Sequence, residues 1–390
     1  MAMERVTGGA AALAGARRET SWVQLALALC AALVLALALA SGAAAQQGTA
    51  PEVETQSPLG GTVPGNTLGA SSDSEMWRAV RQGTAGSVSI PDQKAATLVQ
   101  SEGELWRSVR NGPLALYASW ALLGMIVVLC LFFAIRGRVR IEHGRSDKTI
   151  TRFAAFERFG HWLLASSFII LALTGLNVMY GRYVLMPVIG AEAFGAVTMF
   201  GKYLHNYLAF AFMAGLAIIF LMWVRHNLPD KTDIKWILQG GGLFSKNLHP
   251  PAKKFNAGQK MIFWLTILGG LSVSLSGWSL LFPYTTHFFN DTFVMVNGIF
   301  GTSLPTGLSV LQEQQLASLW HAIMSVFLIC VIIAHIYIGS IGMEGAFDAM
   351  GSGEVDLNWA REHHSLWVEE VLARQGEGAV KTTAAPQPAE

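Results

Sequence analysis

The sequence has few charged residues for its length. Only 14% of its 390 residues are charged and 52% are hydrophobic, whereas about 25% of the residues in a typical soluble domain are charged. Such a composition excludes an ordinary soluble protein and is typical of a membrane protein. The net charge of +1 provides no bulk electrostatic attraction to nucleic acid, so no nucleic-acid partner is expected.

Cysteine is scarce, which limits the cofactors that the chain can hold. Cys30, Cys130 and Cys330 each lie inside an apolar run, so they build neither a disulfide framework nor a four-thiolate metal site. The motif Cys-x-x-Cys-His does not occur, which excludes covalently attached c-type haem. Any haem must therefore be held by axial side-chain ligands alone.

The chain begins with the pattern of a secretory signal. Residues 1–20 contain three arginines, residues 22–40 are apolar, and residues 41–46 are mostly small. This order predicts a signal peptide over residues 1–45 that is cleaved after Ala45. The alternative is an uncleaved first membrane helix, because the apolar run is long enough to span.

Residues 46–112 are rich in Gly, Ser, Thr and Pro and contain a short repeat. The sequence Glu-Met-Trp-Arg-Ala-Val-Arg-Gln-Gly at 75–83 returns at 104–112 as Glu-Leu-Trp-Arg-Ser-Val-Arg-Asn-Gly. The copies around Trp77 and Trp106 are either amphipathic helices that dock on a partner or the membrane, or solvated turns. The segment is expected in the periplasm, with its first part disordered.

Five further apolar runs are each long enough to cross a membrane. They cover residues 113–136, 159–180, 203–224, 261–282 and 316–341. Basic residues are concentrated in 136–158 and 225–260, whereas 283–316 contains no lysine or arginine. By the positive-inside rule the first two connections are cytoplasmic and the third is periplasmic. The tail, 343–390, is expected in the cytoplasm, with a short amphipathic helix on the membrane face and a disordered end.

The last apolar run carries two histidines on one stripe. His321 and His335 are fourteen residues apart, and fourteen steps of about 100° fall roughly 40° short of four turns. At about 1.5 Å per residue the two imidazoles lie roughly 21 Å apart on one helix face. Because polar groups in hydrocarbon are costly, this stripe indicates a cavity, a relay or a cofactor site.

Depth pairs each of these histidines with one on another helix. His161 begins an outward helix near the cytoplasmic surface, and His205 begins an inward helix near the periplasmic surface. His161 can therefore meet His335, and His205 can meet His321. Two bis-imidazole haems stacked in a four-helix bundle require this arrangement.

Other interpretations of the four histidines remain open at this point. Each histidine alone is equally well explained as a hydrogen-bonded packing residue. A zinc or iron transporter would normally add membrane Asp or Glu as ligands, and the five runs contain neither. A non-redox membrane scaffold explains the spans but not the matched pairs. If haem is bound, Arg158 or Lys202 can pair with its propionates.

The chain resembles the cytochrome b (gamma) subunit of membrane-bound, quinone-reducing formate dehydrogenase. The resemblance covers roughly residues 151–371. Besides the four histidines, it rests on Arg-Phe-Gly-His-Trp at 158–162, Phe-Asn-Ala-Gly-Gln-Lys-Met at 255–261 and Trp-Ala-Arg-Glu-His-His at 359–364. The leader, the segment 46–112, the extra run at 113–136 and a long periplasmic loop at 290–305 depart from shorter family members.

The resemblance implies two non-covalent b haems, one held by His161 with His335 and the other by His205 with His321. It also implies a quinone beside the cytoplasmic haem. The residues implicated there are Asn256, Gly258, Gln259 and His335. The alternative for this segment is a cap of the helix that begins near Lys260, a role that Asn and Gly often have.

The fold class expected is an all-α membrane protein. It consists of a four-helix di-haem transmembrane bundle over residues 151–342, one extra N-terminal transmembrane helix at 113–136 and the secretory signal. The resemblance implies an electron-transferring, quinone-reducing subunit in the bacterial inner membrane. Its donor would be a periplasmic iron–sulfur (beta) subunit, and formate would be oxidised on a molybdenum- or tungsten-containing (alpha) subunit. The cytochrome b of a membrane hydrogenase is the close alternative.

Overall fold

The computed structural model describes residues 101–245 and 248–382. The predicted signal peptide and the Trp77 copy of the repeat lie outside the described residues. Five described helices are long and apolar enough to cross a membrane, as the five apolar runs predict, and the chain is a multi-pass membrane protein. These helices are α4 (Ala115–Arg136), α5 (Ala155–Val184), α7 (Ala191–Trp223), α9 (Ala257–Leu281) and α11 (Val310–Tyr337).

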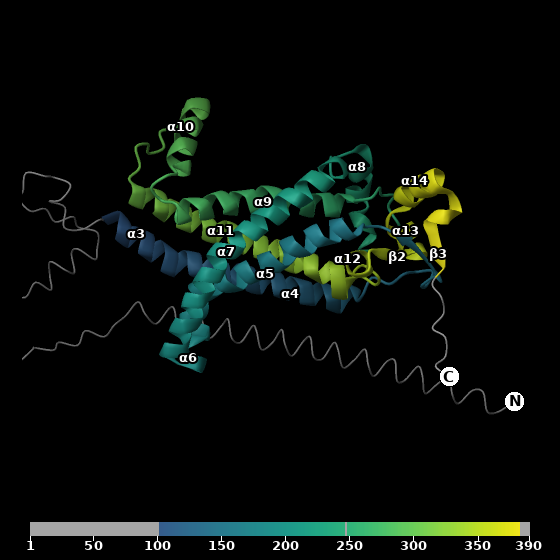
Figure 1. Cartoon of the computed structure of the whole chain (residues 1–390), viewed down its shortest axis with the longest axis horizontal. Helices are drawn as coiled ribbons and strands as arrows, with labels where there is room; N and C mark the ends of the chain where they lie inside the picture. Colours follow the sequence, from purple (N-terminus) through teal and green to yellow (C-terminus); the bar gives the residue numbers. More distant parts are fainter. Residues whose placement is uncertain (1–100, 246–247, 383–390) are drawn as a thin grey trace, which may run out of the picture.

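The long helices form a bundle of two hairpins with a fifth helix beside them (Figure 1). Helix α5 packs along α7, α9 packs along α11, α7 contacts α9, and α4 packs on α11. Large apolar side chains on the spans remain exposed, among them Leu131, Leu173 and Leu268. In a membrane these side chains contact lipid, because the hydrocarbon core is as apolar as they are.

Small residues bring the helices close together. A Cβ at Gly215 of α7 would lie 3.0 Å from the backbone of Leu164 on α5, and one at Gly269 of α9 would lie 2.7 Å from the Leu328 side chain on α11. Small residues at such crossings allow the close packing that holds membrane helices together. Both hairpins are therefore tight, which fixes the relative positions of side chains on α5, α7 and α11.

The two ends of the bundle differ (Figure 1). One end, here called the tail end, carries β1 (Lys148–Thr151), β2 (Glu354–Asp356), β3 (Val380–Thr382), α8 (Lys231–Leu238), α12 (Asp348–Gly351), α13 (Leu357–His363) and α14 (Ser365–Gln375). The opposite end, the α10 end, carries α3 (Ser101–Val109), α6 (Met186–Ile189) and α10 (Phe288–Phe300). Single turns complete the described chain at Arg110–Leu114, Val224–His226, Gly240–Gly242, Ile338–Gly342 and Gly376–Ala379.

The tail end contains a three-stranded antiparallel sheet that an all-α fold does not include. Strand β1 lies between β2 and β3, with Ile150 opposite both Val355 and Val380. The tail forms three α-helices, α12, α13 and α14, where one was expected. Trp359 and Trp367 are 3% and 6% exposed, so these rings pack inside the protein and not on a membrane face.

The second copy of the tryptophan repeat is helical and docks on the bundle. Helix α3 contains Trp106, whose Nε1–H donates a hydrogen bond of 2.8 Å to Ser318 Oγ on α11. At the same end Glu313, 1% exposed, accepts the N–H groups of Phe289 and Asn290 and so caps α10. The Trp106 copy is therefore helical, as one interpretation expects, but the contact it makes here is with α11 of the same chain.

Candidate functional site

The structure brings the four predicted histidines together in two pairs. His161 of α5 faces His335 of α11 with 6.2 Å between ring centroids and 60° between ring planes. His205 of α7 faces His321 of α11 with the same centroid separation and 65° between planes. The pairing is the one expected from depth. Helix α11 contributes one histidine to each pair.

The separation of the rings fits a metal ion between them. A metal–imidazole nitrogen bond is about 2.0–2.1 Å, so two such bonds in line, together with the size of the rings, place the centroids roughly 6 Å apart. Within the part of the chain that the structure describes, no group of three or more His, Cys, Asp or Glu side chains could hold a metal ion. A pair of imidazoles suits a metal that brings its other ligands with it, as haem iron does.

The ring of His205 is fixed by a hydroxyl on the neighbouring helix. Its Nδ1 lies 2.8 Å from Thr174 Oγ1 of α5. The Thr174 hydroxyl has the carbonyls of Ile170 and Leu171 as acceptors, at 2.8 and 3.0 Å. When it donates to one of them, its oxygen accepts the Nδ1–H of His205. The Nε2 of a neutral ring then carries the lone pair that a metal needs.

The ring of His321 is fixed in the same way from α9. Its Nδ1 lies 3.1 Å from the Val273 carbonyl and 3.0 Å from Ser276 Oγ. A carbonyl oxygen can only accept, so Nδ1 carries the proton and Nε2 carries the lone pair. Both rings of this pair therefore present Nε2 as the candidate metal ligand.

Glycines line the α10-end pair. A Cβ at Gly175 of α5 would lie 3.7 Å from His205 Cε1, and one at Gly277 of α9 would lie 3.2 Å from His321 Cε1. The missing side chain at Gly277 lets the His321 ring approach α9 closely, whereas a Cβ at Gly175 would make an ordinary contact with the His205 ring. The residues present thus fit a haem at this pair, by ring separation and by tautomer.

The surroundings of the tail-end pair, His161 and His335, differ from those of the α10-end pair. His161 Nδ1 is buried and has no hydrogen-bond partner in the described structure, and its ring lies edge-on to Trp162 at 5.3 Å. Arg158, an expected propionate partner, donates from Nη1 to the Gly351 carbonyl at 2.6 Å. Trp162 donates from Nε1 to the Met350 carbonyl at 2.9 Å. Helix α5 is therefore tied to the α12 region beside this pair.

Three of the four predicted quinone residues, Asn256, Gly258 and Gln259, lie at the N-terminus of α9, and the fourth, His335, belongs to the tail-end pair on α11. Asn256 Oδ1 accepts the Gln259 N–H at 2.9 Å, and Gln259 Oε1 accepts the Asn256 N–H at 3.2 Å. This reciprocal pair is a capping box, as the capping alternative expects. A Cβ at Gly258 would lie 2.9 Å from Trp236, so Gly258 is needed for packing against α8. A contact of these residues with quinone stays a prediction.

A buried arginine next to this turn was not singled out from the sequence. Arg152 is 3% exposed and lies over the rings of Phe153, Trp359 and Trp367 at 5.2, 5.5 and 5.2 Å. Burial lowers the pKa of Arg152 to about 9. The aromatic faces stabilise the buried cation, and the only sequence signal of this arrangement is a pair of tryptophans in the tail.

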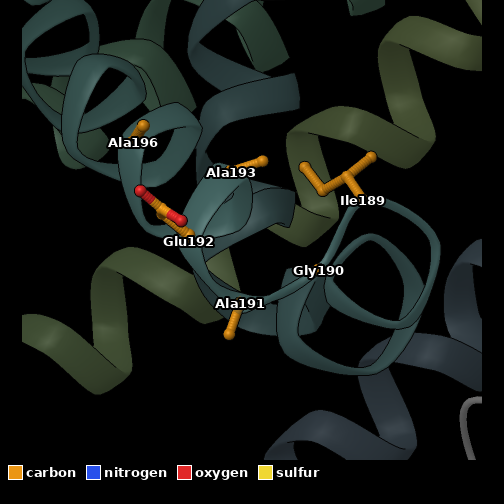
Figure 2. A pocket seen from close by; sticks show the side chains of 6 residues that line it. All are labelled: Ile189, Gly190, Ala191, Glu192, Ala193 and Ala196. Carbon is orange, nitrogen blue, oxygen red and sulfur yellow. The ribbon is translucent and has the colours of Figure 1, made fainter.

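One pocket of the described structure lies away from these residues. Figure 2 shows it at the turn between α6 and α7. Its lining residues are Ile189, Gly190, Ala191, Glu192, Ala193 and Ala196. None of the predicted site residues lines it, and its single ionisable side chain is exposed. The pocket is therefore separate from the histidine pairs.

Comparison with known proteins agrees with this geometry. The sequence model of the family described as prokaryotic cytochrome b561 matches residues 152–353. This chain belongs to the prokaryotic cytochrome b561 family. Membership implies a b-type haem, and the match contains all four paired histidines.

Curated relatives of this cytochrome b561 chain are subunits of formate dehydrogenases. It is 28% identical over 227 residues to the nitrate-inducible formate dehydrogenase cytochrome b556(Fdn) subunit of Escherichia coli K12. The aligned region covers 58% of this chain and 93% of that subunit. The chain is 28% identical over 224 residues to the E. coli K12 formate dehydrogenase cytochrome b556(fdo) subunit, with 57% and 93% covered. The Haemophilus influenzae formate dehydrogenase cytochrome b556 subunit is 25% identical over 233 residues, with 59% and 87% covered. The resemblance seen in the sequence is thereby confirmed.

Proposed function

We propose that this chain is the membrane-anchoring cytochrome b subunit of a formate dehydrogenase complex. It takes electrons from a periplasmic iron–sulfur (beta) subunit, passes them through two b haems and delivers them to quinone near the cytoplasmic face. Formate is oxidised on a molybdenum- or tungsten-containing (alpha) subunit. The observation that carries the proposal is the presence of two histidine pairs, each with 6.2 Å between centroids, joined by one helix.

The role of each histidine in this proposal is that of an axial ligand. His161 and His335 hold one haem, and His205 and His321 hold the other. Bound haem supplies one-electron oxidation and reduction. A haem held by two imidazoles would have no free position for a substrate, so it would supply electron transfer and not ligand binding.

The orientation rests on the distribution of charge. The connections 136–158 and 225–260, which lead to the tail end, are basic, and the connection 283–316 at the α10 end has no lysine or arginine. By the positive-inside rule the tail end faces the cytoplasm and the α10 end faces the periplasm. The iron–sulfur partner then docks at the α10 end, and the chain resides in the bacterial inner membrane.

Quinone is assigned to the tail end, beside the His161–His335 pair. Asn256, Gly258, Gln259 and His335 are its proposed neighbours. The cap of α9 uses Asn256 Oδ1, so the Nδ2 group of the same side chain can donate to a quinone carbonyl. Because formate is oxidised outside and quinone takes up protons from the inside, turnover by this arrangement separates charge across the membrane.

Reduction of the haems in the purified complex tests the proposal. Formate should reduce both b haems of the complex that co-purifies with this chain, and added quinone should reoxidise them. Reduction by hydrogen and not by formate would instead assign the chain to a membrane hydrogenase. Absence of haem from the purified complex would contradict both and favour a non-redox scaffold or transporter.

A further inference from the structure

Four buried nitrogens without a hydrogen-bond partner lie together at the tail end. Within the described residues they are Arg152 Nη1, Trp359 Nε1, His363 Nε2 and His364 Nε2. The Trp359 ring lies 5.3 Å from the His363 ring, 5.5 Å from the His364 ring and 5.5 Å from the Arg152 guanidinium carbon. Buried polar atoms are nearly always paired, and internal water is a common partner.

The atoms of this cluster complement one another as water ligands. His364 is 1% exposed, and its Nδ1–H donates to the Lys253 carbonyl at 2.8 Å. Burial next to Arg152 holds the pKa of His364 well below its ordinary value, so the ring is neutral and its Nε2 accepts. Arg152 Nη1 and Trp359 Nε1 can only donate. Two donors and an acceptor that are buried close together without a protein partner suit ordered water.

On its outer side the cluster meets a network that opens to solvent. His143, whose side chain is 72% exposed, bonds from Nδ1 to Glu362 Oε1 at 2.8 Å. His249 Nε2 bonds to Glu142 Oε2 at 2.9 Å. The His363 ring lies 6.3 Å from the His249 ring. Exchangeable imidazoles and carboxylates thus extend from bulk water to the buried histidines.

On its inner side the cluster reaches the first turn of α9. Arg152 Nη2 donates to the Lys254 carbonyl at 2.6 Å and lies 3.5 Å from Gln259 Oε1. Gln259 is the capping partner of Asn256, and both are proposed quinone neighbours. The cluster therefore lies between solvent and the quinone position.

We propose that His363 and His364, with the water that their Nε2 atoms order, form the path by which protons enter the quinone site. The inference rests on the proposed function. Reduction of one quinone takes two electrons from the b haems and two protons from this path, and both carbonyl oxygens become hydroxyls. No bond other than these two O–H bonds is formed, and no group leaves.

The charged and titratable neighbours of the pair are few. Those that act on His363 are Glu362, His249, Arg152 and Glu142, and those that act on His364 are Arg152 and His363. Burial lowers the pKa of His363 to about 4, although Glu362 and Glu142 favour its protonated form. Burial, and then the Arg152 cation, disfavour a proton that stays on His364. A proton that enters at His363 is therefore not trapped at His364.

Two substitutions of His364 separate proton transfer from structural support. In His364→Asn the amide N–H can replace the Nδ1–H bond to the Lys253 carbonyl, but no titratable nitrogen remains. In His364→Ala both the bond to the Lys253 carbonyl and the titratable nitrogen are lost. His287→Asn is the matched control, since His287 is an exposed histidine at the α10 end and has no place in either site.

The haems of the detergent-purified complex are first reduced with dithionite. The complex is then mixed with a water-soluble quinone, and reoxidation of the haems is followed over a range of pH in H2O and in D2O. His364→Asn should keep its haem and slow reoxidation at least about tenfold at neutral pH, as loss of a proton-transfer group does. The deficit should shrink as pH falls and on addition of imidazole, and the solvent isotope effect should rise. His287→Asn should match the wild type.

Two results would overturn the inference, and they are distinguishable. A wild-type rate and isotope effect in His364→Asn, with slow reoxidation in His364→Ala, would mean that His364 only ties the tail to residue 253. Wild-type haems that quinone does not reoxidise would contradict the proposed function itself, and the proton path with it.

Discussion

Thr174 offers a test of how the fold prepares a histidine for a metal. In Thr174→Val the side chain keeps its shape but loses the oxygen that accepts the His205 Nδ1–H at 2.8 Å. The ring then loses the bond that fixes its tautomer. Loss of such a supporting bond typically costs about 10–100-fold in metal affinity. At about 1.4 kcal/mol per tenfold, this is about 1.4–2.8 kcal/mol of binding free energy.

Ser276 provides the matched comparison on the other side of the same pair. In Ser276→Ala the His321 Nδ1–H loses the hydroxyl at 3.0 Å but keeps the Val273 carbonyl at 3.1 Å. Its haem affinity should therefore change less than that of Thr174→Val. Haem titration of the apo-complex, read from the absorbance of the α10-end haem, measures both. Equal losses in the two variants, or full affinity in Thr174→Val, would refute the role assigned to the hydroxyl.

Three further results are expected. Asn256→Leu should leave haem content and formate-driven haem reduction normal and slow reoxidation by quinone; loss of haem or failed insertion would instead mean that Asn256 only caps α9. Reporter fusions at Gly240 and Ser303 should give opposite compartment signals, and equal signals would contradict the proposed topology. Burial opposes ionisation of Glu362, but hydrogen bonds from His143 and backbone N–H groups outweigh it and hold its pKa below the ordinary value. The stability that ionised Glu362 contributes is thus fully present above the ordinary carboxyl pKa, and it is lost as pH falls through the lowered pKa of the folded state. In Glu362→Gln the melting temperature should therefore fall less steeply on the acid side of its pH profile.

The spans and the histidine pairs could be predicted because their signals are local. Hydrophobic run length predicts the five long helices, and charge in the connections orders their directions. Depth then leaves His161 with His335 and His205 with His321, and the structure has these rings facing each other. A periodic helix and a flat membrane together make depth a simple function of sequence position.

The tail end could not be predicted in this way because its contacts are short and distant in sequence. Strand β1 has four residues, and Ile150 pairs with Val355, about two hundred positions away. The buried Arg152 is likewise covered by Trp359 and Trp367 from the tail. A single basic residue in a basic connection gives no local sign that it is buried.

Fixing the tautomer of a ligand histidine depends on neighbours of ordinary type. Thr174 and Ser276 are hydroxyl residues within apolar helices, where such side chains commonly bond back to their own helix. Both do so here, and each also meets a histidine ring. Only the close helix packing shows which hydroxyl residues have this second partner.

The central claim is tested most directly by a redox difference spectrum with haem quantitation on the purified complex. The wild type should hold about two non-covalent, low-spin b haems per chain. His321→Ala should lose the signal of the α10-end haem, and His335→Ala should lose that of the tail-end haem. Full haem content in both variants would contradict the assignment of these histidines as axial ligands.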